Sequence, residues 1–105
     1  MAVRFDHIAI NVDNIADAAT WYKHNMSAEV LYLDDTWAML HVGGIKLALT
    51  ISSEHPPHIA FKVDACDEMD EDVKIHRDGS HYVYKADPHG NVIELIKYQQ
   101  RIELK

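Results

Sequence analysis

The stretch from Asp87 to Ile96, D-P-H-G-N-V-I-E-L-I, places a carboxylate inside an apolar run that follows a turn signal. The turn is favoured because proline fixes its own φ, while glycine and asparagine tolerate left-handed conformations. Alternate side chains of a strand share a face, so Glu94 would lie beside Val92 and Ile96. A carboxylate among β-branched neighbours is costly to bury unless it is paired. Glu94 therefore either faces solvent or has a partner.

Two histidines begin copies of one short segment. Residues 58–64 (H-I-A-F-K-V-D) repeat residues 7–13 (H-I-A-I-N-V-D), with five of seven positions identical at an offset of 51 residues, which marks a duplicated unit. A single histidine on a strand is more often a hydrogen-bonded core residue than a ligand, but recurrence as His7 and His58 favours a ligand role. With Glu94, the two imidazoles form a facial set suited to a divalent metal with open positions. Such an ion would also offset the buried charge of Glu94.

A strand and a helix are expected at the start of the chain. Residues 5–12 alternate in hydrophobicity and predict a strand with His7 on the face opposite three apolar residues, Ile8, Ile10 and Val12. Asp13 or Asn14 then caps a helix. Its apolar stripe is spaced i, i+3, i+4 and i+7 and consists of Ile15, Ala18, Ala19 and Tyr22. The helix should end near Asn25, which tolerates the left-handed C-terminal position.

Strands fill most of the remaining sequence. Three are expected at residues 29–33, 37–42 and 46–51, with a Gly43-Gly44 turn between the last two. After a linker containing Ser-Ser and Pro-Pro, the second copy continues with a short acidic helix or turn and three strands, at residues 65–73, 74–77, 80–85 and 92–98. The predicted fold is α+β, with two βαβββ modules, about residues 4–51 and 58–98, in a single domain spanning residues 1–105.

The composition excludes several classes of partner. Acidic residues outnumber basic ones 17 to 10 in 105 residues, and no basic stripe is present to bind nucleic acid. Cys66 is the single cysteine, which excludes an internal disulfide and a cysteine metal cluster. The first residues lack the apolar region of a signal peptide and no apolar run reaches membrane-spanning length, so a soluble, cytoplasmic protein without membrane partners is expected. Eight histidines make metal binding worth testing.

Four segments carry a resemblance to a known family: F-D-H-I-A-I-N-V, W-Y-K-H-N-M, H-I-A-F-K-V-D and Y-V-Y-K-A-D-P-H-G-N-V-I-E-L-I. Together they resemble the vicinal oxygen chelate superfamily, which includes glyoxalase I, fosfomycin- and bleomycin-resistance proteins, extradiol dioxygenases and methylmalonyl-CoA epimerase. The resemblance covers residues 5 to about 98 and implies a cup-shaped mixed β-sheet around a metal. The family's ligand positions match His7, Ala48, His58 and Glu94.

Alanine at position 48 departs from two members of that family. Glyoxalase I and the epimerase carry glutamate or glutamine there, and in glyoxalase I this residue takes part in proton transfer, which alanine cannot do. The set of His7, His58 and Glu94 is similar to that of extradiol dioxygenases and fosfomycin-resistance transferases. The dioxygenases usually have longer chains, and the transferases usually carry a phosphonate-binding threonine where this chain has Ala9. The resemblance therefore implies a metal centre without selecting one reaction.

Other residues are candidates for a substrate pocket. By strand parity they are Trp37, Met39, Ala48 and Thr50, with Tyr82 and Tyr84, whose shared face parity does not identify. The alternative for these side chains is ordinary core packing. His41 is the candidate proton-transfer residue, whereas four other histidines are expected at the surface or in turns, namely His24, His76, His81 and His89.

The resemblance implies a metal-dependent enzyme, a lyase, dioxygenase or transferase, acting on a small substrate with adjacent oxygens. The implied cofactor is a divalent ion, Fe, Mn, Ni or Zn. The alternative is a metal-free protein that sequesters a small molecule, as bleomycin-resistance proteins do, and a third is a metal site without turnover. Family members this short commonly dimerise, so a homodimer with a site shared between chains is expected.

Overall fold

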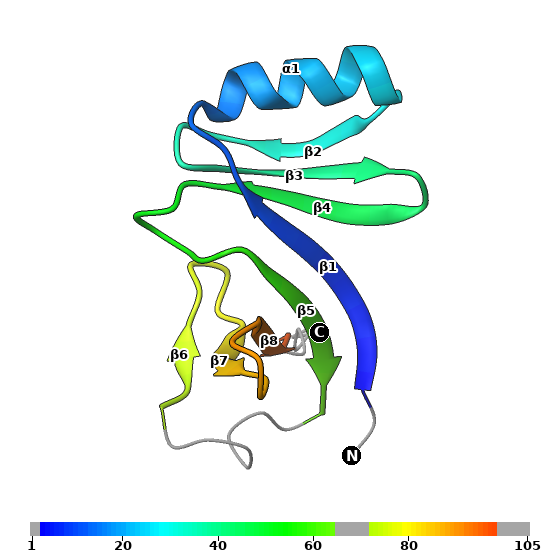
Figure 1. Ribbon diagram of the computed structural model, residues 1–105. Helices are drawn as coiled ribbons and strands as arrows, with labels where there is room; N and C mark the ends of the chain where they lie inside the picture. Colours follow the sequence, from blue (N-terminus) through cyan, green and yellow to red (C-terminus); the bar gives the residue numbers. More distant parts are fainter. Residues whose placement is uncertain (1–2, 65–71, 99–105) are drawn as a thin grey trace, which may run out of the picture. The chain divides into compact units, whose positions relative to one another are not determined.

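The computed structural model describes residues 3–64 and 72–98, which contain one helix and eight strands (Figure 1). The strands form a mixed sheet in the order β2-β3-β4-β1-β5-β8-β7-β6. This confirms the predicted α+β class and the βαβββ arrangement. The chain divides into two compact units, one of residues 6–60 and one of residues 1–5 with 61–105. No helix in the described ranges is long and apolar enough to cross a membrane.

The unit of residues 6–60 holds the helix and, apart from residues 3–5 of β1, the first strands. Their bounds are β1 Val3–Asn11, α1 Ile15–Met26, β2 Glu29–Leu33, β3 Trp37–Val42 and β4 Ile45–Thr50. Strands β2, β3 and β4 are antiparallel neighbours, and β1 pairs with β4 in parallel. Asn14 is the N-cap, because its side chain accepts from the Asp17 N–H. The left-handed residue at the other end is Ser27 (φ 54°), so the prediction that placed it at Asn25 was wrong.

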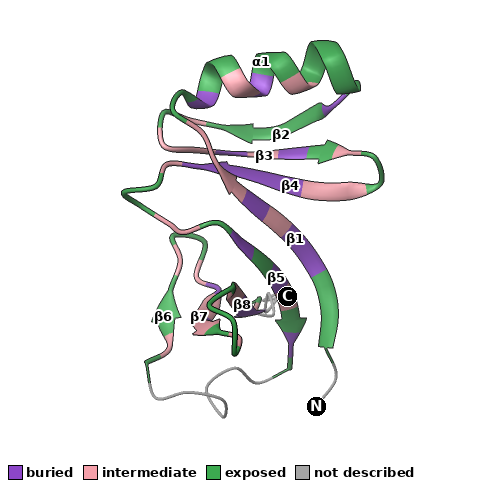
Figure 2. Ribbon diagram, in the orientation of Figure 1, coloured by how far each residue is buried: buried purple, intermediate pink, exposed green. Residues whose placement is uncertain are grey.

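The hydrophobic core of this unit lies between α1 and one face of its strands. Figure 1 shows α1 lying across β2, β3 and β4, and Figure 2 shows the buried residues of β3 and β4 beneath it. Leu40 and Leu49 are fully buried there. The predicted helical stripe is confirmed, since Ile15 and Ala19 belong to this cluster and Ala18 and Tyr22 pack against it. The partly buried Ile8 and Ile10 of β1, and Val12 just after it, also pack there. Because strands alternate their faces, His7 and Ala9 of β1 belong to the opposite face.

The second repeat begins with β5 His58–Val63, of which residues 58–60 belong to the unit of residues 6–60. The unit of residues 1–5 and 61–105 holds the rest, with bounds β6 Lys74–Ile75, β7 His81–Ala86 and β8 Val92–Lys97. Strands β6, β7 and β8 are antiparallel neighbours. A smaller core forms around Val63, Val83 and Leu95. The helix or turn predicted for residues 65–73 lies almost entirely outside the described residues. Ile59 of β5 is 42% exposed, unlike its repeat equivalent Ile8, which packs in the α1 cluster.

The turn before β8 forms as predicted. The Asp87 carboxylate accepts from the backbone N–H groups of His89 and Asn91 and from the Asn91 side chain, at 2.8–2.9 Å. These bonds, that from the Asn91 side chain foremost, lower the pKa of Asp87. Gly90 has a φ of 85°, the left-handed conformation that the turn requires. The turn thus fixes the start of β8 at Val92, and with it the position of Glu94 along the strand.

Candidate metal centre

The two repeated histidines lie side by side in the unit of residues 6–60. The imidazole centroids of His7 on β1 and His58 on β5 are 5.6 Å apart, with the rings inclined at 72°. Both residues are only 7% exposed. The ring nitrogens of buried imidazoles need hydrogen-bond partners or a metal. The hydrogen bonds of each ring therefore determine which of its two nitrogens could bind a metal.

His7 is oriented by the residue that precedes it. Its Nδ1 lies 2.6 Å from Asp6 Oδ2, and Lys46 Nζ lies 3.4 Å from the other Asp6 oxygen. An ionised carboxylate only accepts, so Nδ1 carries the hydrogen that it donates. In metal-binding histidines the outer nitrogen commonly donates to a carboxylate in this way, which fixes the tautomer and leaves Nε2 as the ligand atom. Asp6 was not predicted from the sequence, because neighbouring residues of a strand point to opposite faces.

His58 is oriented by the linker that precedes β5. Its Nδ1 lies 2.7 Å from the Pro56 carbonyl oxygen, which again accepts, so Nε2 is the basic nitrogen. The linker is held in turn by Asn11, whose side-chain amide donates to the His55 carbonyl (3.0 Å) and to Thr50 Oγ1 (2.8 Å). In both histidines, therefore, Nδ1 is engaged with an oxygen acceptor and Nε2 is the atom that would bind a metal.

Glu94 lies in β8, in the other unit, and is 1% exposed. The interpretation of Glu94 as a solvated side chain was wrong. Its Oε2 accepts from His76 Nε2 at 2.7 Å, and Tyr84 is its direct cross-strand neighbour in β7. Burial and the nearby charge of Glu94 raise the pKa of both Tyr84 and Tyr82. The prediction that placed His76 at the surface or in a turn missed this bond, although His76 does lie in a turn.

His7, His58 and Glu94 are each buried, and each offers one atom that could bind a metal. Two neutral nitrogens and one carboxylate oxygen suit a first-row divalent ion and leave further coordination positions. The donor chemistry therefore fits the metal that the resemblance implies, without selecting which ion.

Ala48 sits in the middle of the sheet face that carries His7. The register places it between Ala9 of β1 and Met39 of β3, and it is buried. The alanine methyl group can neither bind a metal nor transfer a proton. The next row along the same face pairs Trp37 with Thr50; the Thr50 hydroxyl donates to the Ile10 carbonyl at 3.2 Å.

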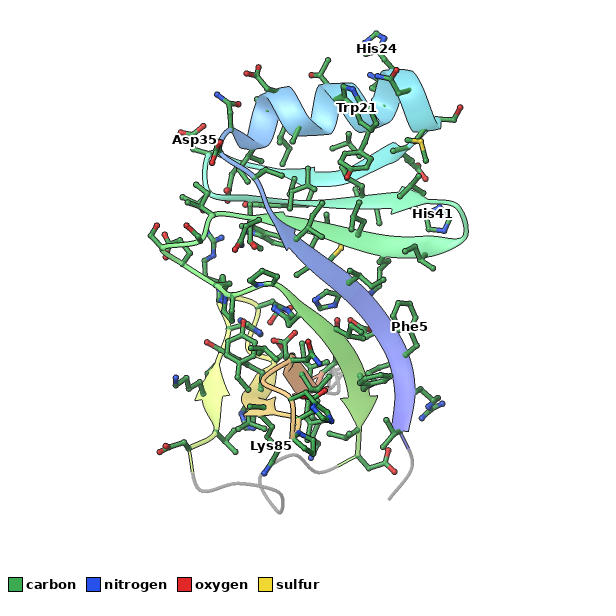
Figure 3. The ribbon with its side chains drawn as sticks, in the orientation of Figure 1. Phe5, Trp21, His24, Asp35, His41 and Lys85 are labelled. Atoms are coloured by element: carbon green, nitrogen blue, oxygen red, sulfur yellow. The ribbon has the colours of Figure 1, made fainter. Side chains whose placement is uncertain are left out.

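His41 lies in the same row as His7, with Lys46 between them in the register. It is exposed, and Figure 3 shows it near the β3–β4 hairpin. Its proton-transfer role remains a prediction, as does pocket lining by the residues selected by strand parity.

The register places both Tyr82 and Tyr84 on the face of their sheet that carries Glu94. His24 is exposed on the outer side of α1 (Figure 3), as predicted.

The fold and the ligand group agree with a match to a family model. Residues 4–95 match the Glyoxalase/Bleomycin resistance protein/Dioxygenase superfamily. The chain belongs to this superfamily. A comparison with curated proteins gave no match.

Solved structures share the fold at low sequence identity. One is a hypothetical protein from Bacillus halodurans C-125, 17% identical, with a TM-score of 0.76 and coverage of 99% of this chain and 100% of the other. Methylmalonyl-CoA epimerase from Mycobacterium tuberculosis is 19% identical, with a TM-score of 0.72 and coverage of 92% and 89%. A Streptomyces coelicolor methylmalonyl-CoA epimerase variant in complex with 2-nitronate-propionyl-CoA is 20% identical, with a TM-score of 0.73 and coverage of 92% and 98%. Similarity at this level establishes the fold alone.

Proposed function

We propose that the protein is a divalent-metal-dependent enzyme acting on a small substrate with adjacent oxygens, and that His7, His58 and Glu94 hold the metal. The observation that carries this proposal is the state of the two histidines: each Nδ1 is bound to an acceptor, so each ring offers Nε2.

The ligand set determines what kind of substrate group would be attracted. A divalent ion would supply Lewis-acid chemistry and an ordered template for substrate oxygens. One carboxylate against two positive charges leaves the centre positive, which favours anionic or polarised oxygens over cationic groups. Because Ala48 provides no base, any proton transfer would fall to another residue, for which His41 remains the candidate.

The direct test is metal analysis of the purified wild-type chain, followed by titration of the metal-free protein with Mn²⁺, Ni²⁺ and Zn²⁺. We expect about one bound ion per chain, the stoichiometry of a three-ligand centre. A folded chain that takes up no divalent ion would contradict the proposal. That outcome would instead favour metal-free sequestration of a small molecule.

A homodimer with a site shared between chains is part of the proposal. Sedimentation at micromolar concentration should give twice the 12.0 kDa chain mass, because family members of this length commonly pair their modules between chains. A 12.0 kDa monomer that binds a full equivalent of metal would contradict the shared site.

Adding a carboxylate at position 48 should strengthen the centre. Ala48→Glu is expected to tighten divalent-metal binding roughly tenfold, the scale on which groups around a metal ligand act, and to raise activity toward methylglyoxal and glutathione from an undetectable wild-type level. Calorimetric titration measures the first effect. The matched control is Ala16→Glu on the exposed side of α1, which adds the same charge elsewhere. Equal tightening in both variants would mean that net charge, not ligation, is responsible.

A further inference from the structure

His76 is held in place by a closed turn between β6 and β7. The His76 N–H donates to the Ser80 carbonyl and the Gly79 N–H donates to the His76 carbonyl, both at 2.9 Å. The Asp78 carboxylate accepts from the Ser80 N–H at 2.8 Å and from its hydroxyl at 2.6 Å. Gly79 has a φ of 89°, which a side-chain-bearing residue rarely adopts. The turn explains why β6 ends at Ile75 rather than at the predicted Arg77.

The imidazole plane of His76 is fixed as well. It stacks on the Tyr82 ring with a centroid distance of 3.5 Å and an interplanar angle of 6°. Tyr82 is itself in edge contact with Tyr84, at 5.3 Å and 68°. Stacked and edge-on aromatic contacts restrict ring rotation and add stability beyond the area that they bury. The stack therefore holds the imidazole in one plane, and within that plane Nε2 has a single direction in the structure.

That direction is toward Glu94. The Nε2–Oε2 distance of 2.7 Å is short for an N–H···O bond, as expected when the acceptor is charged. All four side chains, His76, Tyr82, Tyr84 and Glu94, belong to the same compact unit. A buried carboxylate without such a donor would be costly to keep ionised, and its rotamer would be less defined.

We propose that His76 is a positioning residue for Glu94: stacked on Tyr82, it holds the carboxylate in one orientation and thereby sets the affinity of the metal centre. This inference rests on the proposed metal-binding function. His76 does not ligate the ion in this arrangement, because its Nε2 is the donor to Glu94.

The test compares metal affinity and imidazole state in three variants. His76→Ala should weaken Mn²⁺ or Zn²⁺ binding by about 10–100-fold, the usual cost of losing the partner of a metal ligand. His76→Gln, which retains a side-chain N–H donor, should stay within about threefold of the wild type. His89→Ala, which removes an exposed histidine of the same unit, should have no effect. In the metal-free wild type, ¹⁵N NMR should show the His76 proton on Nε2, and Glu94→Gln should shift this signal.

The outcomes separate this inference from the proposed function. A wild type that binds no divalent ion overturns the proposed function and the role of His76 with it. A wild type that binds metal as tightly as His76→Ala overturns the inference alone. So does a tautomerically averaged His76 in the metal-free wild type, whatever the affinities.

Discussion

Replacing His58 with alanine is expected to weaken divalent-metal binding by at least about 100-fold. Loss of a residue that merely orients a ligand costs 10–100-fold, and His58 is proposed to be a ligand itself. His7→Ala and Glu94→Gln should give losses of the same order, because each removes one of only three protein donors. The measurement is calorimetric titration of the metal-free variants with Zn²⁺ or Mn²⁺, together with a thermal melt to confirm folding.

His24→Ala is the matched control for these variants. It removes the same side chain from the exposed outer side of α1, so its metal affinity should equal that of the wild type. The ligand assignment would be wrong if a folded His58→Ala protein bound the ion as tightly as the control. A loss in His24→Ala as large as that in His58→Ala would show non-specific binding by exposed histidines.

Truncation of Leu49 is expected to destabilise the protein by about 2–5 kcal/mol, the range for Leu→Ala in a packed core. Leu49 is fully buried in β4. The register places it between Ile10 and Ala38, and it belongs to the cluster that includes Ile15 and Ala19 of α1. The remaining cavity would be lined by these side chains. Urea denaturation of wild type and variant measures the difference.

Leu31→Ala provides the comparison, because it deletes the same atoms from a side chain that is 49% exposed on β2. Its cost should stay below about 1 kcal/mol, since little apolar area returns to water. Equal costs for the two variants would contradict the placement of the core between α1 and β3-β4. Metal affinity should change little in either variant, because Leu49 and His7 lie on opposite faces of the sheet.

Side-chain periodicity determined which face of β1 carries the candidate ligand. On a pleated strand, successive side chains point to opposite faces. Ile8 and Ile10 must therefore share one face of β1, and His7 and Ala9 the other. The helix was predicted for the same reason, from a stripe at its own period of 3.6 residues. The repeat at His58 added a second strand of the same kind, and the motifs together indicated the family. Each of these features is a pattern of residue types along the chain, so it can be recognised without knowing which strands pair.

Tertiary structure alone decided how each candidate ligand is oriented. The Pro56 carbonyl and His76 lie in turns and linkers, where no periodicity relates a residue to a face, and the bond from His76 to Glu94 crosses 18 positions of the sequence. Parity predicted that Tyr82 and Tyr84 share a face, but only the register of Tyr84 with Glu94 identified that face. Register depends on which strands pair and where their turns close. The sequence by itself therefore determined which residue types are available to a metal, and the fold decided which of their atoms are available, because hydrogen bonding to Nδ1 fixes each ring only after the chain has brought its partner into place.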